Sequence, residues 1–217
     1  MSASKIINNI ESSGVVAIIR ASSSGELVDV VSALRDGGLT CIEVTMTTPN
    51  ALEVIHQARE KMGDSAAIGV GTVLDSETAR AAILAGAQFV VAPIVDAGTI
   101  AICKRYSVPV LPGAMTPTEI VHAWHAGADI VKVFPASAGG PGFIRDMKGP
   151  LPHIKMLATG GVTLENCGEF IKAGAEALGT GSALVSKELV KKKDYAGLKA
   201  AASQWLQRVS QARDSLK

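Results

Sequence analysis

A lysine stands in the middle of an apolar segment, where a charged side chain is unusual. Lys132 occupies the third position of residues 130–134 (IVKVF), a run whose length and composition are typical of a buried β-strand. Burial of a lone ammonium group is costly, and the usual response is a lowered pKa, so that part of the amine is uncharged at neutral pH. An uncharged amine attacks ketones to form a Schiff base. Lys132 is therefore a candidate catalytic nucleophile.

A glutamate occupies a similar position in an earlier strand-like run. Side chains alternate across a strand, so Lys132 shares a face with Phe134. By the same rule, Glu43 shares a face with Thr45 and Thr47. If both faces point to one interior, Glu43 can hold the ammonium group in the resting state and carry protons through carbinolamine, imine and enamine steps. The alternative is a buried ion pair that does no chemistry, or a side chain that extends outward between sheet and helices.

Glycines gather in two later segments. The sequence reads TGG at residues 159–161 and GTGS at residues 179–182. Glycine frees backbone N–H groups and lets a ligand approach closely, and the clusters fall on the last two predicted strands. Together they predict a phosphate site, although glycines that simply end strands would give the same pattern.

The elements that must position these residues can be predicted from periodicity. Short runs rich in Val and Ile alternate with longer segments of helical periodicity along the chain, which predicts eight strand–helix pairs. The predicted strands are 15–20, 41–46, 67–73, 89–93, 109–113, 130–135, 155–161 and 177–183. Predicted helices include 26–36, 51–61, 76–85, 117–126, 164–173 and 195–213.

A repeated junction supports this count. Glycine precedes a strand in DGG at 36–38 and in AGA at 85–87, 126–128 and 173–175, where it fits the left-handed cap that ends a helix. This regular array predicts an α/β fold, a closed (β/α)8 TIM barrel. A doubly wound open sheet is the alternative. It is less favoured because most of the strands lack polar alternation and none opens into a G-x-G-x-x-G turn.

In a barrel of this kind the chemistry gathers at the carboxyl ends of the strands. Few polar residues lie within or at the end of the predicted strands, so each is a candidate site residue. They are Arg20, Glu43, Thr45, Thr47, Thr72, Lys132, Thr159 and Ser182.

Length and charge narrow the class of protein. The 217 residues contain no linker-like stretch, so we expect one domain over residues 1–217 with a short helical extension at its start. With 21 basic and 20 acidic side chains the net charge is +1, which indicates neither nucleic acid nor a membrane as a partner. No segment resembles a signal peptide or reaches the roughly 18 apolar residues of a membrane span, so we expect a cytoplasmic protein.

Two other sets of residues could bind metal. Cys41, Cys103 and Cys167 are widely spaced and lack the paired spacing of a zinc site, which predicts buried reduced thiols. His122 and His125 are spaced for one face of a helix, but no third ligand accompanies them. We therefore expect a solvated or partner-facing helix face there and no metal site.

Six segments together resemble one known family, the 2-keto-3-deoxy-6-phosphogluconate (KDPG) and 4-hydroxy-2-oxoglutarate (KHG) aldolases. The resemblance runs nearly end to end, in the family's order. The segments are VVAIIR at 15–20, IEVT at 42–45, GVGTV at 69–73, VKVFP at 131–135, TGGV at 159–162 and GSAL at 181–184. The resemblance implies a class I aldolase on a (β/α)8 barrel, usually a homotrimer, that needs no metal or other cofactor. Such an enzyme cleaves a small phosphorylated 2-keto acid to pyruvate and glyceraldehyde 3-phosphate.

The resemblance also implies roles for individual residues. Lys132 matches the imine-forming lysine, and Glu43 matches the glutamate that carries protons. The matches to substrate-binding positions are Thr72 and Pro93 at the pyruvyl end, Phe134 beside the imine, Thr159, and for the phosphate Gly160, Gly161 and Ser182. Thr45, on the face of Glu43, and Gly181, next to Ser182, are further expected to contact the substrate and its phosphate.

One position departs from the family pattern. Many members carry an arginine four residues after the glutamate, where it binds the substrate carboxylate, and this chain has Thr47. Another branch of the family ends its first strand with an arginine, as Arg20 does here, and bidentate pairing with a carboxylate would suit that side chain. Relatives that act on the galactonate epimer also use a first-strand arginine, whereas TGG at 159–161 favours the gluconate substrate.

Two other functions compete with the aldolase. A metal-dependent phosphosugar enzyme of the same fold, such as an epimerase, requires histidines and aspartates at strand ends, and the predicted strands supply none. A catalytically silent barrel that binds a phosphorylated metabolite predicts binding without turnover.

Overall fold

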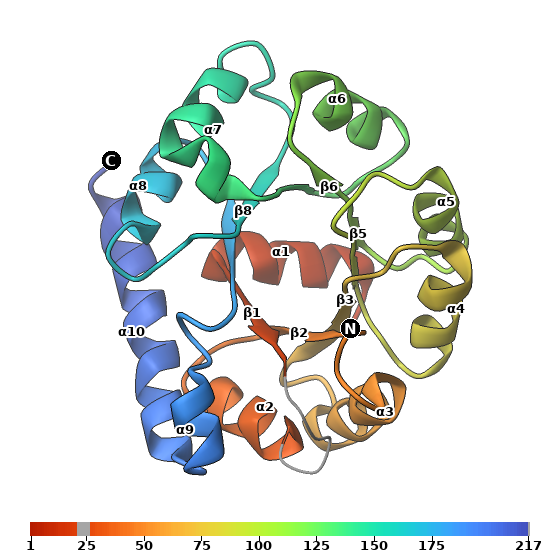
Figure 1. Cartoon of the computed structure of the whole chain (residues 1–217), viewed down its shortest axis with the longest axis vertical. Helices are drawn as coiled ribbons and strands as arrows, with labels where there is room; N and C mark the ends of the chain where they lie inside the picture. The colour runs from red at the N-terminus through yellow and green to blue at the C-terminus, as the bar shows by residue number, and fades with distance from the viewer. Residues whose placement is uncertain (21–26, 217) are drawn as a thin grey trace.

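Parallel strands form a barrel surrounded by helices in the computed structural model, which describes residues 1–20 and 27–216 (Figure 1). The strands are β1 (Val15–Ile19), β2 (Cys41–Thr45), β3 (Ala67–Gly71), β4 (Val90–Val91), β5 (Val110–Leu111), β6 (Gly113–Ala114), β7 (Val131–Val133), β8 (Met156–Thr159) and β9 (Ala177–Thr180). Their order in the sheet is β5-β4-β3-β2-β1-β9-β8-β7-β6. The predicted barrel fold is confirmed.

β5 and β6 stand at the two ends of this order and are consecutive in the chain, so together they complete the ring. β5 pairs with β4, whereas β6 pairs with β7. Pro112 lies between them; it has no N–H to donate, although its carbonyl accepts a hydrogen bond from Lys132 N at 2.9 Å. The prediction of one continuous strand over 109–113 is therefore wrong. The other predicted strands occur where expected, and most end earlier than predicted.

Helices cover the outside of the barrel. They are α2 (Leu27–Asp36), α3 (Ala51–Met62), α4 (Ser76–Leu84), α5 (Ala97–Arg105), α6 (Pro117–His125), α7 (Gly140–Lys148), α8 (Cys167–Lys172), α9 (Lys187–Lys191) and α10 (Tyr195–Asp214), with a 3-10 turn, η1 (Ala136–Ala138). Glu26, predicted to begin the helix over 26–36, lies outside the described residues. The helix predicted over 164–173 begins later, at Cys167, because Thr163 N donates to Asn166 Oδ1 at 2.8 Å in a preceding turn.

Glycines at the predicted helix–strand junctions adopt positive φ angles. The values are 101° at Gly38, 107° at Gly86, 106° at Gly127 and 106° at Gly174. A side chain at these positions would be strained, so glycine allows each helix to end and the chain to turn into the next strand. The predicted left-handed junctions are confirmed.

An N-terminal helix, α1 (Ala3–Ser13), lies across the amino ends of the strands and is seen through the middle of the ring in Figure 1. Its Ile6 and Ile10 are buried and form one apolar cluster with interior residues near the strand starts, such as Cys41 and Phe89. Burial of these side chains fills the amino end of the barrel. Chemistry must therefore be sought at the carboxyl end.

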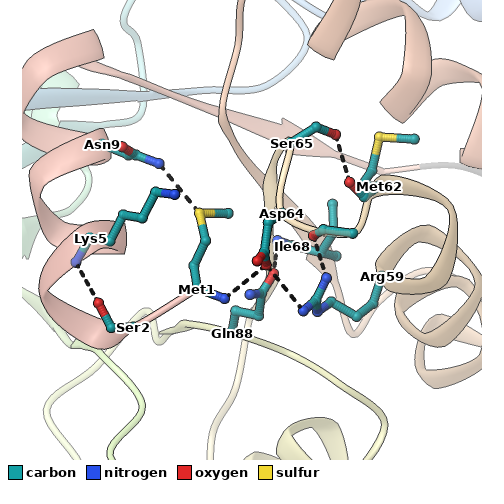
Figure 2. Close-up of polar contacts among 11 residues, drawn as sticks. Met1, Ser2, Lys5, Asn9, Arg59, Met62, Asp64, Ser65, Ile68 and Gln88 are labelled. Atoms are coloured by element: carbon teal, nitrogen blue, oxygen red, sulfur yellow. Dashed lines mark hydrogen bonds and ion pairs between the residues drawn. The ribbon is translucent and has the colours of Figure 1, made fainter.

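Polar contacts hold the start of α1 against the barrel (Figure 2). The Met1 amino group donates to Asp64 Oδ1 at 3.0 Å, and Arg59 lies 3.5 Å from the same oxygen. The hydrogen bond from Met1 and the charge on that amino group lower the pKa of the Asp64 carboxyl. Ser2 caps the helix, because its hydroxyl accepts from Lys5 N at 3.3 Å. The contact between Met1 and Asp64 links the start of α1 to the turn that precedes β3.

The three cysteines are free and buried, as predicted. Burial raises the pKa of the Cys41 thiol and of the Cys103 thiol to about 12. No described helix is long and apolar enough to span a membrane.

Candidate active site

Lys132 points into the barrel. It lies on β7, where Val131 and Val133 belong to the outer apolar cluster and the preceding Ile130 belongs to the interior one. Strand alternation therefore directs Lys132 inward. The residue is only 5% exposed, and its Nζ lies 4.9 Å from the centre of the Phe134 ring, in a cation–π contact.

Glu43 projects inward from β2, on the opposite side of the ring from β7. The residue is 2% exposed. Its neighbour on β3 is a glycine: a β-carbon on Gly71 would lie 1.5 Å from Glu43 Oε1. The Cα of Glu43 is level with Gly69 in the ladder, so its side chain reaches along β3 toward the carboxyl end of the barrel.

Burial shifts the pKa values of the two charged groups in opposite directions. It raises the pKa of the Glu43 carboxyl, although the charges on Lys132 and Arg20 lower it. It lowers the pKa of the Lys132 amine, with Arg20 adding to the effect and Glu43 opposing it. An amine that loses its proton readily thus shares the barrel interior with a carboxyl group that takes one up readily. That combination is what Schiff-base chemistry requires.

Arg20 stands directly after β1, exposed at the carboxyl end of the barrel. Its charge acts on both Glu43 and Lys132, so the three ionisable groups form one electrostatic unit. An exposed guanidinium group at this end can pair with a carboxylate in a bidentate manner.

The end of β2 carries a cluster of threonine hydroxyls. Thr45 Oγ1 lies 2.9 Å from Thr47 Oγ1 and donates to the Ile19 carbonyl at 3.4 Å. Thr47 was expected in the strand that carries Glu43; this is wrong, because β2 ends at Thr45 and Thr47 lies exposed in the following turn, with its hydroxyl beside that of Thr45. The cluster ties the end of β2 to the residue that precedes Arg20.

The two glycine clusters lie at the carboxyl ends of β8 and β9, which are neighbours in the sheet; Gly179 is inside β9, whereas Gly181 follows it. Gly160 and Gly161 have φ angles of 94° and 72°, where glycine is favoured. A β-carbon on Gly161 would lie 2.6 Å from Ser137 Cβ, so this loop packs closely on η1. Gly181 and Ser182 follow β9, with Ser182 exposed. Turns of this kind present backbone N–H groups to an anion.

Thr159, at the end of β8, has a buried hydroxyl without a hydrogen-bond partner in the described part of the chain. It faces the interior with Leu157, two residues earlier. Gly179 lies opposite it in the ladder, and a β-carbon there would lie 2.2 Å from Thr159 Oγ1. Buried hydroxyls normally have a partner, so this one is available to a ligand.

Thr72 and Pro93 follow β3 and β4. Thr72 has a φ of 61°, which is unusual for a residue with a branched β-carbon, and such strain clusters at functional sites. Pro93 and Phe134 border a pocket of about 420 Å³, whose polar lining comes from Glu119 and His122 of α6.

The space left by interior glycines is the site feature that sequence reasoning missed; Gly179 was predicted only as part of the phosphate-binding cluster. Gly71 and Gly179 give Glu43 and Thr159 the space that they occupy. Gly71 was part of a recognised segment, but no role was predicted for it. The available signal was the pair of glycines at 69 and 71, two residues apart in a predicted strand, where both would face the interior.

In residues 1–20 and 27–216, no group of three or more His, Cys, Asp or Glu side chains could hold a metal ion. His122 and His125 are exposed on α6, as expected of a solvated face.

Comparison with known proteins matches this chain to one family over nearly its whole length. The profile described as KDPG and KHG aldolase covers residues 6–201. The chain belongs to this aldolase family. The family consists of lyases, and the recognition made from the six sequence segments is confirmed.

Individual aldolases of the family include enzymes named for either epimer. The chain is 37% identical to the 2-dehydro-3-deoxy-6-phosphogalactonate aldolase of Escherichia coli (strain K12) over 171 residues, 78% of this chain and 83% of the relative. It is 33% identical to the 2-dehydro-3-deoxy-phosphogluconate aldolase of Treponema pallidum (strain Nichols) over 203 residues, 93% of this chain and 96% of the relative.

A solved aldolase structure shows the same fold. It is that of KDPG aldolase from Legionella pneumophila, with pyruvate captured at low pH as a covalent carbinolamine intermediate. The TM-score is 0.85 at 25% identity, over 91% of this chain and 96% of the other.

Proposed function

We propose that this protein is a class I aldolase that reversibly cleaves 2-dehydro-3-deoxy-6-phosphogluconate to pyruvate and D-glyceraldehyde 3-phosphate through an imine on Lys132. The observation that carries the proposal is the buried Lys132 amine, coupled electrostatically to a buried Glu43 carboxyl inside the barrel of an aldolase-family chain. The Legionella pneumophila relative, in which pyruvate was captured as a carbinolamine, supports the covalent route.

The proposed reaction uses the two groups in turn. The uncharged Lys132 amine attacks the substrate's C2 ketone to give a carbinolamine. The carbinolamine takes up a proton from solvent and loses water to become a protonated imine. Glu43 then removes the proton of the C4 hydroxyl, the C3–C4 bond breaks, and the aldehyde leaves while the electron pair forms an enamine. Glu43 returns its proton to C3 of the enamine, and water hydrolyses the resulting imine to release pyruvate.

The remaining residues would bind the ends of the substrate. Arg20 is proposed to pair with the carboxylate, because it is the cation at the carboxyl end whose charge reaches both reactive groups. Thr45, Thr72, Pro93, Phe134 and Thr159 would contact the chain of the substrate. Gly160, Gly161, Gly181 and Ser182, on the loops after β8 and β9, would hold the phosphate.

A second candidate substrate is the galactonate epimer. It is favoured by Arg20 in combination with Thr47, where many relatives have an arginine, and by the 37% identity to an aldolase named for that epimer. The test is kcat/KM for both epimers on the same preparation. A ratio above about tenfold, roughly 1.4 kcal/mol, would assign the preferred substrate. Unphosphorylated 4-hydroxy-2-oxoglutarate is a further proposed substrate of the same site.

We also propose a homotrimer in which the whole chain acts as one domain. The support is the large apolar side chains that stand exposed near the ends of β3 and β4, Leu74 at 54% and Ile94 at 48%. Light scattering at several concentrations would measure the state.

The central experiment traps the imine. The protein is incubated with pyruvate, reduced with borohydride and digested, and the added mass is located by peptide mass spectrometry. We expect the adduct on Lys132, no adduct in Lys132→Met, and full labelling in the matched control Lys155→Met. Absence of any adduct, under conditions that label a known imine-forming enzyme, would refute the mechanism. Loss of activity on chelation would instead support the metal-dependent alternative.

A further inference from the structure

We propose that Gly71 is a positioning residue: its missing side chain directs the Glu43 carboxyl group toward the carboxyl end of the barrel, where a substrate enters. This inference rests on the function proposed above. Glu43 is level with Gly69 in the β2–β3 ladder, whereas Gly71 is level with Thr45, one inward-facing position closer to the open end. The Glu43 side chain therefore reaches along β3 and lies over Gly71.

Any side chain at Gly71 would occupy the space of this carboxyl group. An ideal β-carbon there would lie 1.5 Å from Glu43 Oε1, 2.2 Å from Cδ and 2.7 Å from Cγ. These separations are far shorter than van der Waals contact, so the outer part of Glu43 would have to move. The required shift involves the functional end of the side chain.

The backbone at Gly71 does not itself require glycine. Its φ angle lies outside the left-handed region, in contrast to the φ of 61° at the following Thr72, and the residue belongs to a regular strand. The Gly71 carbonyl accepts a hydrogen bond from Met46 N at 2.8 Å, which alanine would preserve. Gly71→Ala therefore acts through the volume of one methyl group. Because the overlapping atoms belong to a flexible side chain, the fold should tolerate the change.

Displacement of the carboxyl group should affect proton transfer more than covalent binding. The Lys132 amine is on β7, across the barrel, and the three atoms nearest to a β-carbon on Gly71 all belong to Glu43. A misplaced Glu43 would leave the amine able to react but would lengthen the path of the proton to and from the substrate carbon. General acid–base groups must be within hydrogen-bond reach to act.

Gly69→Ala provides a matched control on the same strand and face. A β-carbon at Gly69 would lie 2.4 Å from ring atoms of Phe89, in the apolar cluster at the amino end. The three atoms nearest to this β-carbon all belong to the Phe89 ring, so the substitution crowds the apolar core. We expect it to lower the thermal midpoint more than Gly71→Ala does, with kcat per folded molecule preserved.

The experiment is a double-substitution cycle read by deuterium exchange into the methyl group of pyruvate, followed by NMR, with borohydride trapping of the imine in parallel. We expect Gly71→Ala to slow exchange by about tenfold to a hundredfold, while the trapped imine changes by less than about threefold. In the Glu43→Gln background, adding Gly71→Ala should slow the residual exchange by less than about threefold, because the group it displaces is already inactive.

Each result separates the inference from the proposed function. Equal losses from Gly71→Ala in both backgrounds would show a general packing effect and overturn the positioning role. Unchanged exchange in Gly71→Ala, with an imine formed by the unsubstituted protein, would also overturn it and leave the aldolase mechanism standing. If the unsubstituted protein forms no imine on Lys132, the proposed function fails first.

Discussion

Substitution of Glu43 by glutamine tests the proton-carrying role directly. Glutamine keeps the shape of the side chain and fits the same space over Gly71, so neither a cavity nor a clash is created. What is lost is the ability to take up and release a proton. General acid–base catalysis contributes about 10² to 10⁴ in rate, so kcat should fall by that factor, about 2.7 to 5.5 kcal/mol in activation free energy.

The same substitution should change the titration of Lys132. The Glu43 carboxylate raises the pKa of the Lys132 amine, against the larger lowering by burial. Without that carboxylate the pKa of Lys132 falls further, so imine formation in Glu43→Gln should persist to more acidic pH than in the unsubstituted protein. The assay is borohydride trapping of pyruvate as a function of pH, quantified by intact mass.

The pKa shifts of Lys132 and Glu43 predict how the free energy of unfolding changes with pH. The pKa of Lys132 in the folded protein lies below its ordinary value of 10.5, so in that interval the unfolded chain binds more protons and stability rises with pH. Removing the Glu43 carboxylate widens the interval, so the rise extends over a larger pH range and its total is greater. For Glu43 itself the sign is opposite: its raised pKa favours the folded state at low pH, and that contribution is lost as pH rises through the folded pKa.

Urea unfolding at several pH values between neutrality and 10 would measure these slopes. Glu165→Gln, at an exposed glutamate before α8, is the control and should leave kcat and both pH profiles unchanged. If Glu43→Gln retained more than about a tenth of kcat, Glu43 would not be the proton carrier.

Three further substitutions test the rest of the site and the fold. Arg20→Ala should raise KM for the keto acid by about tenfold or more with a smaller change in kcat, because charge-assisted hydrogen bonds contribute about 1.5–3 kcal/mol. Steady-state kinetics would measure both constants, and an unchanged KM would exclude Arg20 as the residue that binds the carboxylate. Thr159→Val should raise KM. It should preserve or increase the thermal midpoint of unfolding, because it removes a buried hydroxyl without a partner in the described chain. A lower thermal midpoint would show that the hydroxyl makes a structural hydrogen bond. Ile10→Ala should lower the free energy of unfolding, measured by urea denaturation, by about 2–5 kcal/mol. The kcat per folded molecule should be unchanged, since Ile10 fills the end of the barrel away from the site. A loss under about 1 kcal/mol would contradict that packing.

Much of the architecture could be predicted because local signals agree with the global fold. Glycines such as Gly86 and Gly127 mark helix ends by a backbone requirement that depends on a few neighbouring residues. Buried strands can be recognised in the sequence as runs of apolar residues. The strand predicted over 109–113 failed because periodicity cannot tell which neighbour a residue pairs with, and Pro112 divides pairing between β4 and β7.

Only part of the candidate site could be predicted from the sequence. Lys132 and Glu43 were recognisable because a charge inside an apolar run is costly, and the cost is visible in sequence. Thr47 was wrongly assigned to the strand because the end of β2 is set by the turn that follows it. The glycines at 69 and 71 indicated interior space, but its use by Glu43 could not be predicted, since it depends on the register between β2 and β3.

The sequence by itself determined the family, the barrel and the identity of the charged residues, because these follow from local composition and order. The tertiary structure alone decided that Lys132 and Glu43 face one interior, that burial raises the pKa of Glu43, and that the two charges act on each other. It also decided that Arg20 acts on both groups. Electrostatic shifts depend on desolvation and on distances between groups far apart in the chain, and only the folded barrel fixes those quantities.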